Sequence, residues 1–264
     1  MRSVLGIDAA WTEKQPSGVA LVTETTSGWH LEAIAGSYLD FLTLGKIASD
    51  GYPMKPDPTA IIRACEMIHA RTPDIVAIDM PIAHSPITSR RASDNAVSKA
   101  YGGRWASTHT PSATRPGKIA DDLRSGFDTV GYPLSTTELQ FPSLIEVYPH
   151  PALIELLNAE KRLPYKISNR GKYWPDHTAD ERLDLILNCW QSISTALEGR
   201  ISGVATALPI PPRNSKIAAF KSFEDSLDAV ICAWVAICAL NDKAVPFGDE
   251  DSAIWIPLPL SKPN

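Results

Sequence analysis

Apolar runs separated by short polar turns predict strands in the first part of the chain. Residues 3–7 form an apolar run that ends in Asp8, and residues 19–23 form a second run after the turn at 15–18. Residues 29–38 alternate well enough for a third strand. Because short turns join these runs, we expect an antiparallel three-strand meander.

The pattern then changes to a helix followed by a returning strand. Residues 44–58 contain Gly and Pro and are expected to form a loop, whereas residues 59–70 place apolar side chains at helical spacing. The apolar run 75–78 repeats the opening pattern, since it too ends in an aspartate, Asp79. A strand, a helix and a returning strand favour a parallel neighbour for the first strand.

The remaining chain predicts further helices, one more core strand and several loops. Helices are expected at 92–101, 119–127, 152–157, 180–197 and 223–240, a strand at 144–148, exposed or linking loops at 160–178 and 203–216, and an edge strand at 253–257. The helix at 223–240 is apolar on almost every face, so we expect it to be buried.

One segment is basic within an acidic protein. Residues 84–118 are crowded with hydroxyl and basic side chains and poor in core residues. We interpret it, with the helix that follows, as a basic and hydroxyl-rich insertion at about 84–130 in a single domain spanning 1–264. Asp94 is the one acidic side chain of residues 84–118. The basic side chains are Arg90, Arg91, Lys99, Arg104, Arg115 and Lys118.

Composition bounds the class of protein. The 264 residues, 44% hydrophobic and 21% charged, are ordinary for a soluble globular protein. The net charge of −5 argues against non-specific coating of nucleic acid and leaves room for a local basic patch. No apolar run reaches the roughly 18 residues of a membrane span. Because the chain enters a predicted strand at once, we expect no signal peptide. The cysteines lie in apolar helical patterns without metal or redox spacing, so we expect a cytoplasmic protein with reduced thiols.

Acidic residues are expected to meet at one edge of the sheet. Asp8 and Asp79 end two strands that the crossover places side by side, and Glu146 belongs to a third strand. Asp225 and Asp228 are three residues apart and project from one side of the last helix. Open α/β sheets bind ligands at the carboxyl ends of their strands. Gathered carboxylates repel one another unless cations neutralise them, and Mg²⁺ or Mn²⁺ suits such oxygen ligands.

Each acid also has a simpler interpretation. Asp8 and Asp79 could only stabilise turns, and Glu146 could only pair with an arginine. Ser222 and Asp225 resemble a capping box at the start of the last helix, so capping could be the whole role of Asp225. Asp228 lies too deep in the helix to cap it and needs a partner.

The basic segment has alternatives as well. Arg90 and Arg91 could bind phosphate bidentately or form a solvated helix start. Arg104, Arg115 and Lys118 could add charge to a phosphate site, or the segment could be a plain surface loop. His109 and His150 could shuttle protons, although a loop histidine beside proline is more often structural. Stacking on bases by aromatic residues competes with a packing role for Trp11, Trp105 and Tyr101.

The chain resembles a known family through motifs spread over nearly its whole length. In order they are Gly6-Ile7-Asp8, Ala77-Ile78-Asp79-Met80-Pro81, Arg90-Arg91 with Asp94, Glu146-Val147-Tyr148-Pro149, Asp225-x-x-Asp228-Ala229 and Ile254-Trp255-Ile256-Pro257. These are similar to the domain-of-unknown-function family number four-twenty-nine of predicted RNase H-like nucleases, which is related to the RuvC-type Holliday-junction resolvases.

The resemblance implies a fold and an activity. The fold would be an α/β, RNase H-like mixed five-stranded sheet, with an antiparallel three-strand meander plus parallel strands, flanked by helices. The activity would be a metal-dependent nuclease with Asp8, Asp79, Asp225 and Asp228 as metal ligands. The resolvases typically carry glutamate where this chain has Asp79, so Glu146 could be needed to complete the catalytic set. A resolvase-like enzyme would also be expected to form a homodimer.

Three functions follow from these observations. The first is a hydrolase that uses Mg²⁺ or Mn²⁺ to cleave DNA or RNA. The second is a non-catalytic module of the same fold that binds nucleic acid or protein through the basic segment. The third is an ATP-dependent phosphotransferase of the actin-like or sugar-kinase type, which the missing Gly-rich phosphate loop and the missing second half disfavour.

Overall fold

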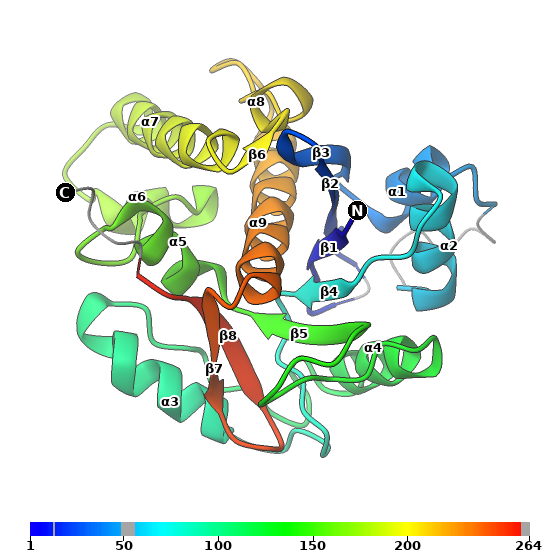
Figure 1. Cartoon of the computed structure of the whole chain (residues 1–264). Coiled ribbons are helices and arrows are strands. Elements are labelled where there is room, and N and C mark those ends of the chain that lie inside the picture. Colours follow the sequence, from blue (N-terminus) through cyan, green and yellow to red (C-terminus); the bar gives the residue numbers. More distant parts are fainter. Residues whose placement is uncertain (13, 49–55, 260–264) are drawn as a thin grey trace.

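The computed structural model describes residues 1–12, 14–48 and 56–259, and these form a mixed α/β fold around one sheet (Figure 1). The sheet has eight strands in the order β6-β3-β2-β1-β4-β5-β8-β7. Their bounds are β1 Ser3–Asp8, β2 Gly18–Thr25, β3 Gly28–Ala35, β4 Ile75–Ile78, β5 Ser143–Val147, β6 Ile201–Ser202, β7 Ala244–Gly248 and β8 Ala253–Pro257.

Helices cover both faces of this sheet. They are α1 Tyr38–Leu44, α2 Pro58–His69, α3 Ala92–Tyr101, α4 Lys118–Thr129, α5 Pro149–Leu157, α6 Arg170–Tyr173, α7 Ala179–Glu198, α8 Val204–Ala207 and α9 Ile217–Leu240, with 3₁₀ turns η1 Gly102–Arg104 and η2 Ile167–Asn169. In Figure 1, α9 crosses the sheet on one face, and α1, α2 and α4 lie apart from it toward the other side.

The predicted α/β class and meander are confirmed, but the predicted five strands are wrong in number. Strands β1, β2 and β3 pair antiparallel, and β4 and β5 continue parallel to β1. Strand β6 adds to one side, and β8 with β7 adds to the other. The predicted edge strand at 253–257 is therefore an inner strand, because β7 pairs with its outer side and supplies the edge.

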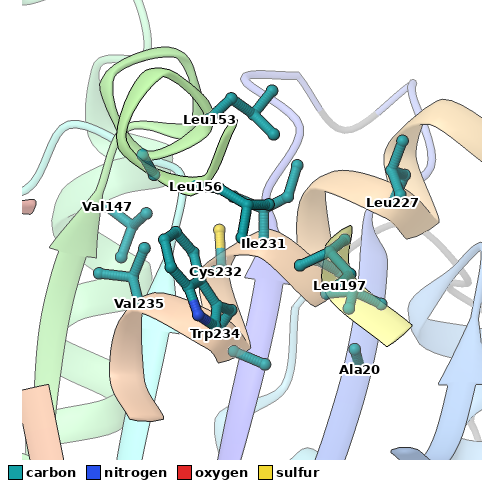
Figure 2. Close-up of a cluster of buried hydrophobic side chains, with 14 of the residues drawn as sticks. Ala20, Val147, Leu153, Leu156, Leu197, Leu227, Ile231, Cys232, Trp234 and Val235 are labelled. Carbon is teal, nitrogen blue, oxygen red and sulfur yellow. The ribbon is translucent and has the colours of Figure 1, made fainter. Parts of the chain in front are cut away.

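Helix α9 is the centre of the larger hydrophobic core. It packs on β1 and β2, and α5 and α7 close over it. Figure 2 shows part of this core, where Ile231, Trp234 and Val235 of α9 lie among side chains of α5, β5 and α7. Gly6 permits the close approach of helix and strand, because a Cβ at this position would lie 2.0 Å from the carbonyl oxygen of Ala229.

Several predicted boundaries are wrong, and each error has a local cause. The strand expected over 29–38 ends at Ala35, because Ser37 caps a short helix, α1, that the alternating pattern concealed. The loop expected over 160–178 contains η2 and α6. The loop at 203–216 begins with α8. Part of the loop predicted over 44–58 lies outside the described residues.

None of the helices in the described ranges is both sufficiently long and sufficiently apolar to span a membrane.

Candidate functional site

Asp8 and Asp79 stand side by side where two parallel strands end. Ile7 of β1 pairs with Ile78 of β4, and the amide of Asp79 donates to the carbonyl oxygen of Ile7 at 2.8 Å. Side chains alternate along a strand, and Gly6, two residues before Asp8, packs directly on α9. Both aspartates therefore point toward the α9 face of the sheet, at its carboxyl edge.

Helix α9 brings further acids to the same point. Gly18 pairs with Asp8 across β1 and β2, and a Cβ on Gly18 would lie 2.1 Å from the carbonyl oxygen of Asp225. The backbone of α9 thus rests on the sheet directly beside Asp8. The alternative in which Asp225 only caps the helix is excluded, because α9 begins at Ile217, about two turns earlier.

Two lysines lie among these acids. Lys166 donates to Asp228 and lies 3.6 Å from Glu224, while Lys221 donates to Asp225 and to Glu224, the latter at 3.0 Å. We call this group the aspartate cluster. It comprises Asp8, Asp79, Lys166, Lys221, Glu224, Asp225 and Asp228.

Neutral donors complete the inner part of the cluster. The Tyr165 hydroxyl donates to Asp228 at 2.7 Å, and the backbone amide of Ile167 donates to Glu224 at 2.6 Å. Asp228 and Glu224 are thus fully enclosed, with 0% and 1% of their surface exposed. The hydrogen bonds of the cluster go to the acids of α9 and leave the carboxylates of Asp8 and Asp79 without a donor from the described residues.

The electrostatics of the cluster favour protons or cations. Burial, and then the charge of Asp228, raise the pKa of Asp8 well above its usual range, and the same causes raise the pKa of Asp79 to about 7. Burial also raises the pKa of Asp225, against the opposing effect of Lys221. Burial by itself would lower the pKa of Lys166, but Asp228, Tyr165 and Asp8 raise it well above its usual range. Lys166 therefore stays charged and acts as a counter-ion.

A cavity of about 520 Å³ opens onto the outer side of the cluster. The walls nearest the sheet come from Asp8, Asp79 and Asp225, with Lys166 and Lys221 beside them. The other walls come from two separate segments, with Trp11, Gln15 and Pro16 on one and His109, Thr110 and Arg115 on the other. The structure therefore brings the predicted residues Asp8, Asp79, Asp225, His109 and Arg115 to one cavity.

Glu146 does not join this cavity. Register places it opposite Ile78 rather than Asp79, so its side chain points to the face of the sheet away from α9. Arg91 binds both of its oxygens, at 2.5 and 2.8 Å, and also pairs with Asp94 at 3.0 Å. We call Arg91, Asp94 and Glu146 the arginine cluster. All three side chains are buried, so neither Glu146 nor Arg91 is available to a substrate as the structure stands.

Other predicted substrate-binding residues are held by the protein itself. Arg90 donates to Asn95, Ser98 and Thr110 and so fixes the loop that follows α3. Arg104 pairs with Glu155 at 2.7 Å and binds two backbone carbonyl oxygens. Lys118 is exposed and pairs with Asp122 along one face of α4.

Sequence reasoning missed the cations of the aspartate cluster. Lys221 lies three and four residues before Glu224 and Asp225, which is the spacing of helical ion pairs, so a correct start for α9 would have identified it. Lys166 was concealed in a segment read as an exposed loop. Its neighbours Leu163, Tyr165 and Ile167 are buried and alternate with it, which is the signal that this segment packs against the core.

The donor set fits Mg²⁺ or Mn²⁺ in its chemistry. Within the part of the chain that the structure describes, no three His, Cys, Asp or Glu side chains already form an arrangement that could hold a metal ion. Mg²⁺, however, is usually held by one or two carboxylates together with water and substrate phosphate, rather than by a closed protein cage. Asp8 and Asp79, adjacent and without donors, meet that smaller requirement.

Comparison with known proteins identifies the family of the chain. Residues 6–253 match the model of the family described as "Protein of unknown function (DUF429)". No curated protein and no solved structure matches the chain. Since the match spans most of the sequence, the chain belongs to the DUF429 family.

Proposed function

We propose that this member of the DUF429 family is a nuclease that hydrolyses phosphodiester bonds with the help of Mg²⁺ or Mn²⁺. The observation that supports this most is the pair Asp8 and Asp79, which share one open cavity with Arg115 and His109. The five strands β3-β2-β1-β4-β5 have the mixed arrangement expected of an RNase H-like sheet, which supports the same assignment.

The residues of the cavity divide the work in this proposal. Asp8 and Asp79 would hold the cation with their free carboxylate oxygens. The cation would supply charge neutralisation at the phosphate and activation of the attacking water. Arg115 and His109 line the same cavity and would bind the phosphate. Lys166 and Lys221 keep the acids of α9 in place, so that these acids do not repel the substrate.

The test is cleavage of a panel of single-stranded, duplex, hybrid and branched nucleic acids with Mn²⁺. We expect cleavage by the wild-type protein and a loss of at least about a hundredfold in Asp8→Asn and in Asp79→Asn, because losing a metal ligand costs more than losing a supporting contact. Asp122→Asn is the matched control, since Asp122 is an exposed aspartate on α4 that pairs only with Lys118. The proposal fails if wild type cleaves nothing, or if both variants keep full activity.

A second function is favoured by one observation. Lys166 and Lys221 already neutralise Asp228, Asp225 and Glu224. A protein whose acids carry their own counter-ions could bind nucleic acid without any metal or turnover. Calorimetric titration with Mn²⁺ separates the two functions: heat of binding that disappears in Asp8→Asn supports the nuclease, whereas no heat in wild type supports the binding module.

A further inference from the structure

The outer walls of the cavity carry an aromatic ring and a guanidinium, and metal binding by the aspartates does not explain either group. Trp11 follows β1 and is partly buried against the core on the face of the sheet away from α9. The guanidinium of Arg115 lies over the Trp11 ring, 5.6 Å from its centre, so a base that stacks on this face would take the place of the guanidinium and leave it free to hold the adjoining phosphate. An aromatic ring beside an exposed arginine is the combination with which proteins bind an unpaired base and its phosphate.

Arg115 differs from the other cations of the cavity. Lys166 and Lys221 are both bound to carboxylates of α9. Arg115 forms no ion pair with the acids of the described residues, and its side chain is exposed. It is therefore the cation of this cavity that is available to an incoming anion.

The loop that carries Arg115 is held in shape. Arg90 donates to the hydroxyl of Thr110 at 3.0 Å, and Ser112 and Arg115 exchange backbone hydrogen bonds at 2.8 and 3.1 Å. Gly117 closes the loop at φ +63, a conformation that favours glycine. A wall that is already ordered loses little entropy when it binds a ligand.

The size of the cavity sets the form of the ligand. Its volume of about 520 Å³ is that of a pocket for a small molecule. Trp11 and Arg115 lie next to each other in the lining of this cavity, and Asp8 and Asp79 line it as well. A duplex cannot bring a base against Trp11 without unpairing it, whereas a single strand can.

We infer that the site takes single-stranded nucleic acid, with one base stacked on Trp11 and the adjoining phosphate held by Arg115. This inference rests on the proposed nuclease function for its substrate class and deepens it. It assigns Trp11 and Arg115 as the residues that determine specificity for unpaired strands, and it leaves binding of the cation to Asp8 and Asp79.

The test is fluorescence anisotropy in EDTA, which prevents cleavage, with labelled oligothymidylate, oligouridylate and a duplex of equal length. We expect at least one single strand to bind about tenfold more tightly than the duplex. Trp11→Ala should weaken single-strand binding about tenfold, and Trp11→Phe should restore most of it, because any aromatic ring can stack. Arg115→Ala should weaken binding of both single strands and reduce its dependence on salt.

Trp105→Ala is the matched control. Trp105 is also an exposed tryptophan beside a cation, with Lys161 4.1 Å from its ring, but it lies outside the cavity. We expect it to bind as wild type does. Equal affinity for strand and duplex, unchanged binding in Trp11→Ala, or an equal loss in Trp105→Ala would each overturn the inference.

Titration with Mn²⁺ separates this inference from the proposed function. Trp11→Ala should bind Mn²⁺ as wild type does, because Trp11 contributes no oxygen ligand. A protein that binds Mn²⁺ but does not prefer single strands would contradict the inference and leave the nuclease function standing. A protein that prefers single strands through Trp11 but binds no Mn²⁺ would support the inference and contradict the metal-dependent nuclease.

Discussion

The aspartate cluster and the arginine cluster lie at the same edge of the sheet and are built of the same kinds of groups. They differ in whether all of their carboxylates are bound by donors. In the arginine cluster, Arg91 presents a planar fork to Glu146 and Asp94, and the backbone amide of Ile82 binds Glu146 as well. Each carboxylate there has donors, and all three side chains are buried. In the aspartate cluster, the donors reach Glu224, Asp225 and Asp228 and leave Asp8 and Asp79 facing the cavity.

The difference shows which buried acids are structural and which are available. Burial raises the pKa of Glu146, while the charge and hydrogen bonds of Arg91 oppose this effect. Asp8 and Asp79 are subject to the same burial, and the charge of Asp228 adds to it rather than opposing it. Acids held at such a cost to stability are typical of functional sites. The comparison yields four predictions.

The largest effect is expected from Arg91→Met. The substitution leaves two carboxylates buried without their cation, which costs about 3 to 5 kcal/mol in the free energy of unfolding. Urea denaturation measures it. Lys118→Met is the control, because this exposed ion pair contributes less than about 1 kcal/mol. A loss for Arg91→Met as small as that of the control would mean that the arginine cluster does not stabilise the fold.

Gly18→Ala should disturb the aspartate cluster and not the arginine cluster. The new Cβ would lie 2.1 Å from the Asp225 carbonyl oxygen, so α9 must move away from β2. We expect a loss of about 2 to 3 kcal/mol in the free energy of unfolding, typical of overpacking, together with weaker Mn²⁺ binding. Urea denaturation and calorimetry measure these two effects. Gly103→Ala is the matched control, because nothing lies within 4 Å of its added Cβ. Equal results for the two variants would contradict the close contact of α9 with the sheet.

Asp79→Asn and Asp94→Asn should change stability in opposite directions. Removing the charge of Asp79 removes the cost of burying that charge and then its repulsion by Asp228, so we expect a gain of about 2 kcal/mol near pH 8. Removing the charge of Asp94 weakens its bonds from Arg91, so we expect a loss of about 1.5 to 3 kcal/mol.

The size of the stability gain in Asp79→Asn depends on pH. Its pKa is about 7 in the folded protein and 3.8 without these surroundings, so the folded state binds the proton more tightly. Stability of wild type should then fall as the pH rises from about 4 to about 7, and the gain in Asp79→Asn should grow over the same window. Urea denaturation across this range measures it. If Asp79→Asn and Asp94→Asn lowered the free energy of unfolding equally at pH 8, the two clusters would not differ.

The sequence predicts the four aspartates of the aspartate cluster but not Lys166, Lys221 and Glu224, for a physical reason. A strand that ends in Asp8 and a crossover strand that ends in Asp79 become neighbours through a general rule of chain connection. No such rule predicts the face on which the Glu146 side chain lies, because a shift of one residue along β5 would move it to the other face. The pairing of Ile78 with Glu146 is fixed only when the whole sheet forms.

The lysines depend on tertiary packing in the same way. Lys166 reaches Asp228 because Tyr165 and Ile167 anchor a segment that has almost no secondary structure of its own. The polar composition of this segment is that of a loop, and only the alternation of its apolar residues with Lys166 indicates that it packs on the core. Helix α9 shows the opposite case. Its buried part was predicted, but its more exposed first turns, from Ile217, were not.

The smallest expected effect concerns Mn²⁺ binding and pH. Under the proposed function, the cation binds Asp79 only in its deprotonated form, and its pKa of about 7 lies in an accessible range. We expect Mn²⁺ affinity to rise about tenfold between pH 6 and pH 8 and then to level off, with protons released on binding. Calorimetry in buffers of different ionisation enthalpy measures both the affinity and the protons.

Asp121→Asn provides the control for this last prediction. Asp121 lies in the first turn of α4, outside the residues that line the cavity, so the variant should keep both the Mn²⁺ affinity and its rise with pH. An affinity that does not change with pH in wild type would mean that Asp79 takes no part in binding the cation. The open carboxylates would then differ from those of the arginine cluster only in exposure, and the basis for assigning them a function would be lost.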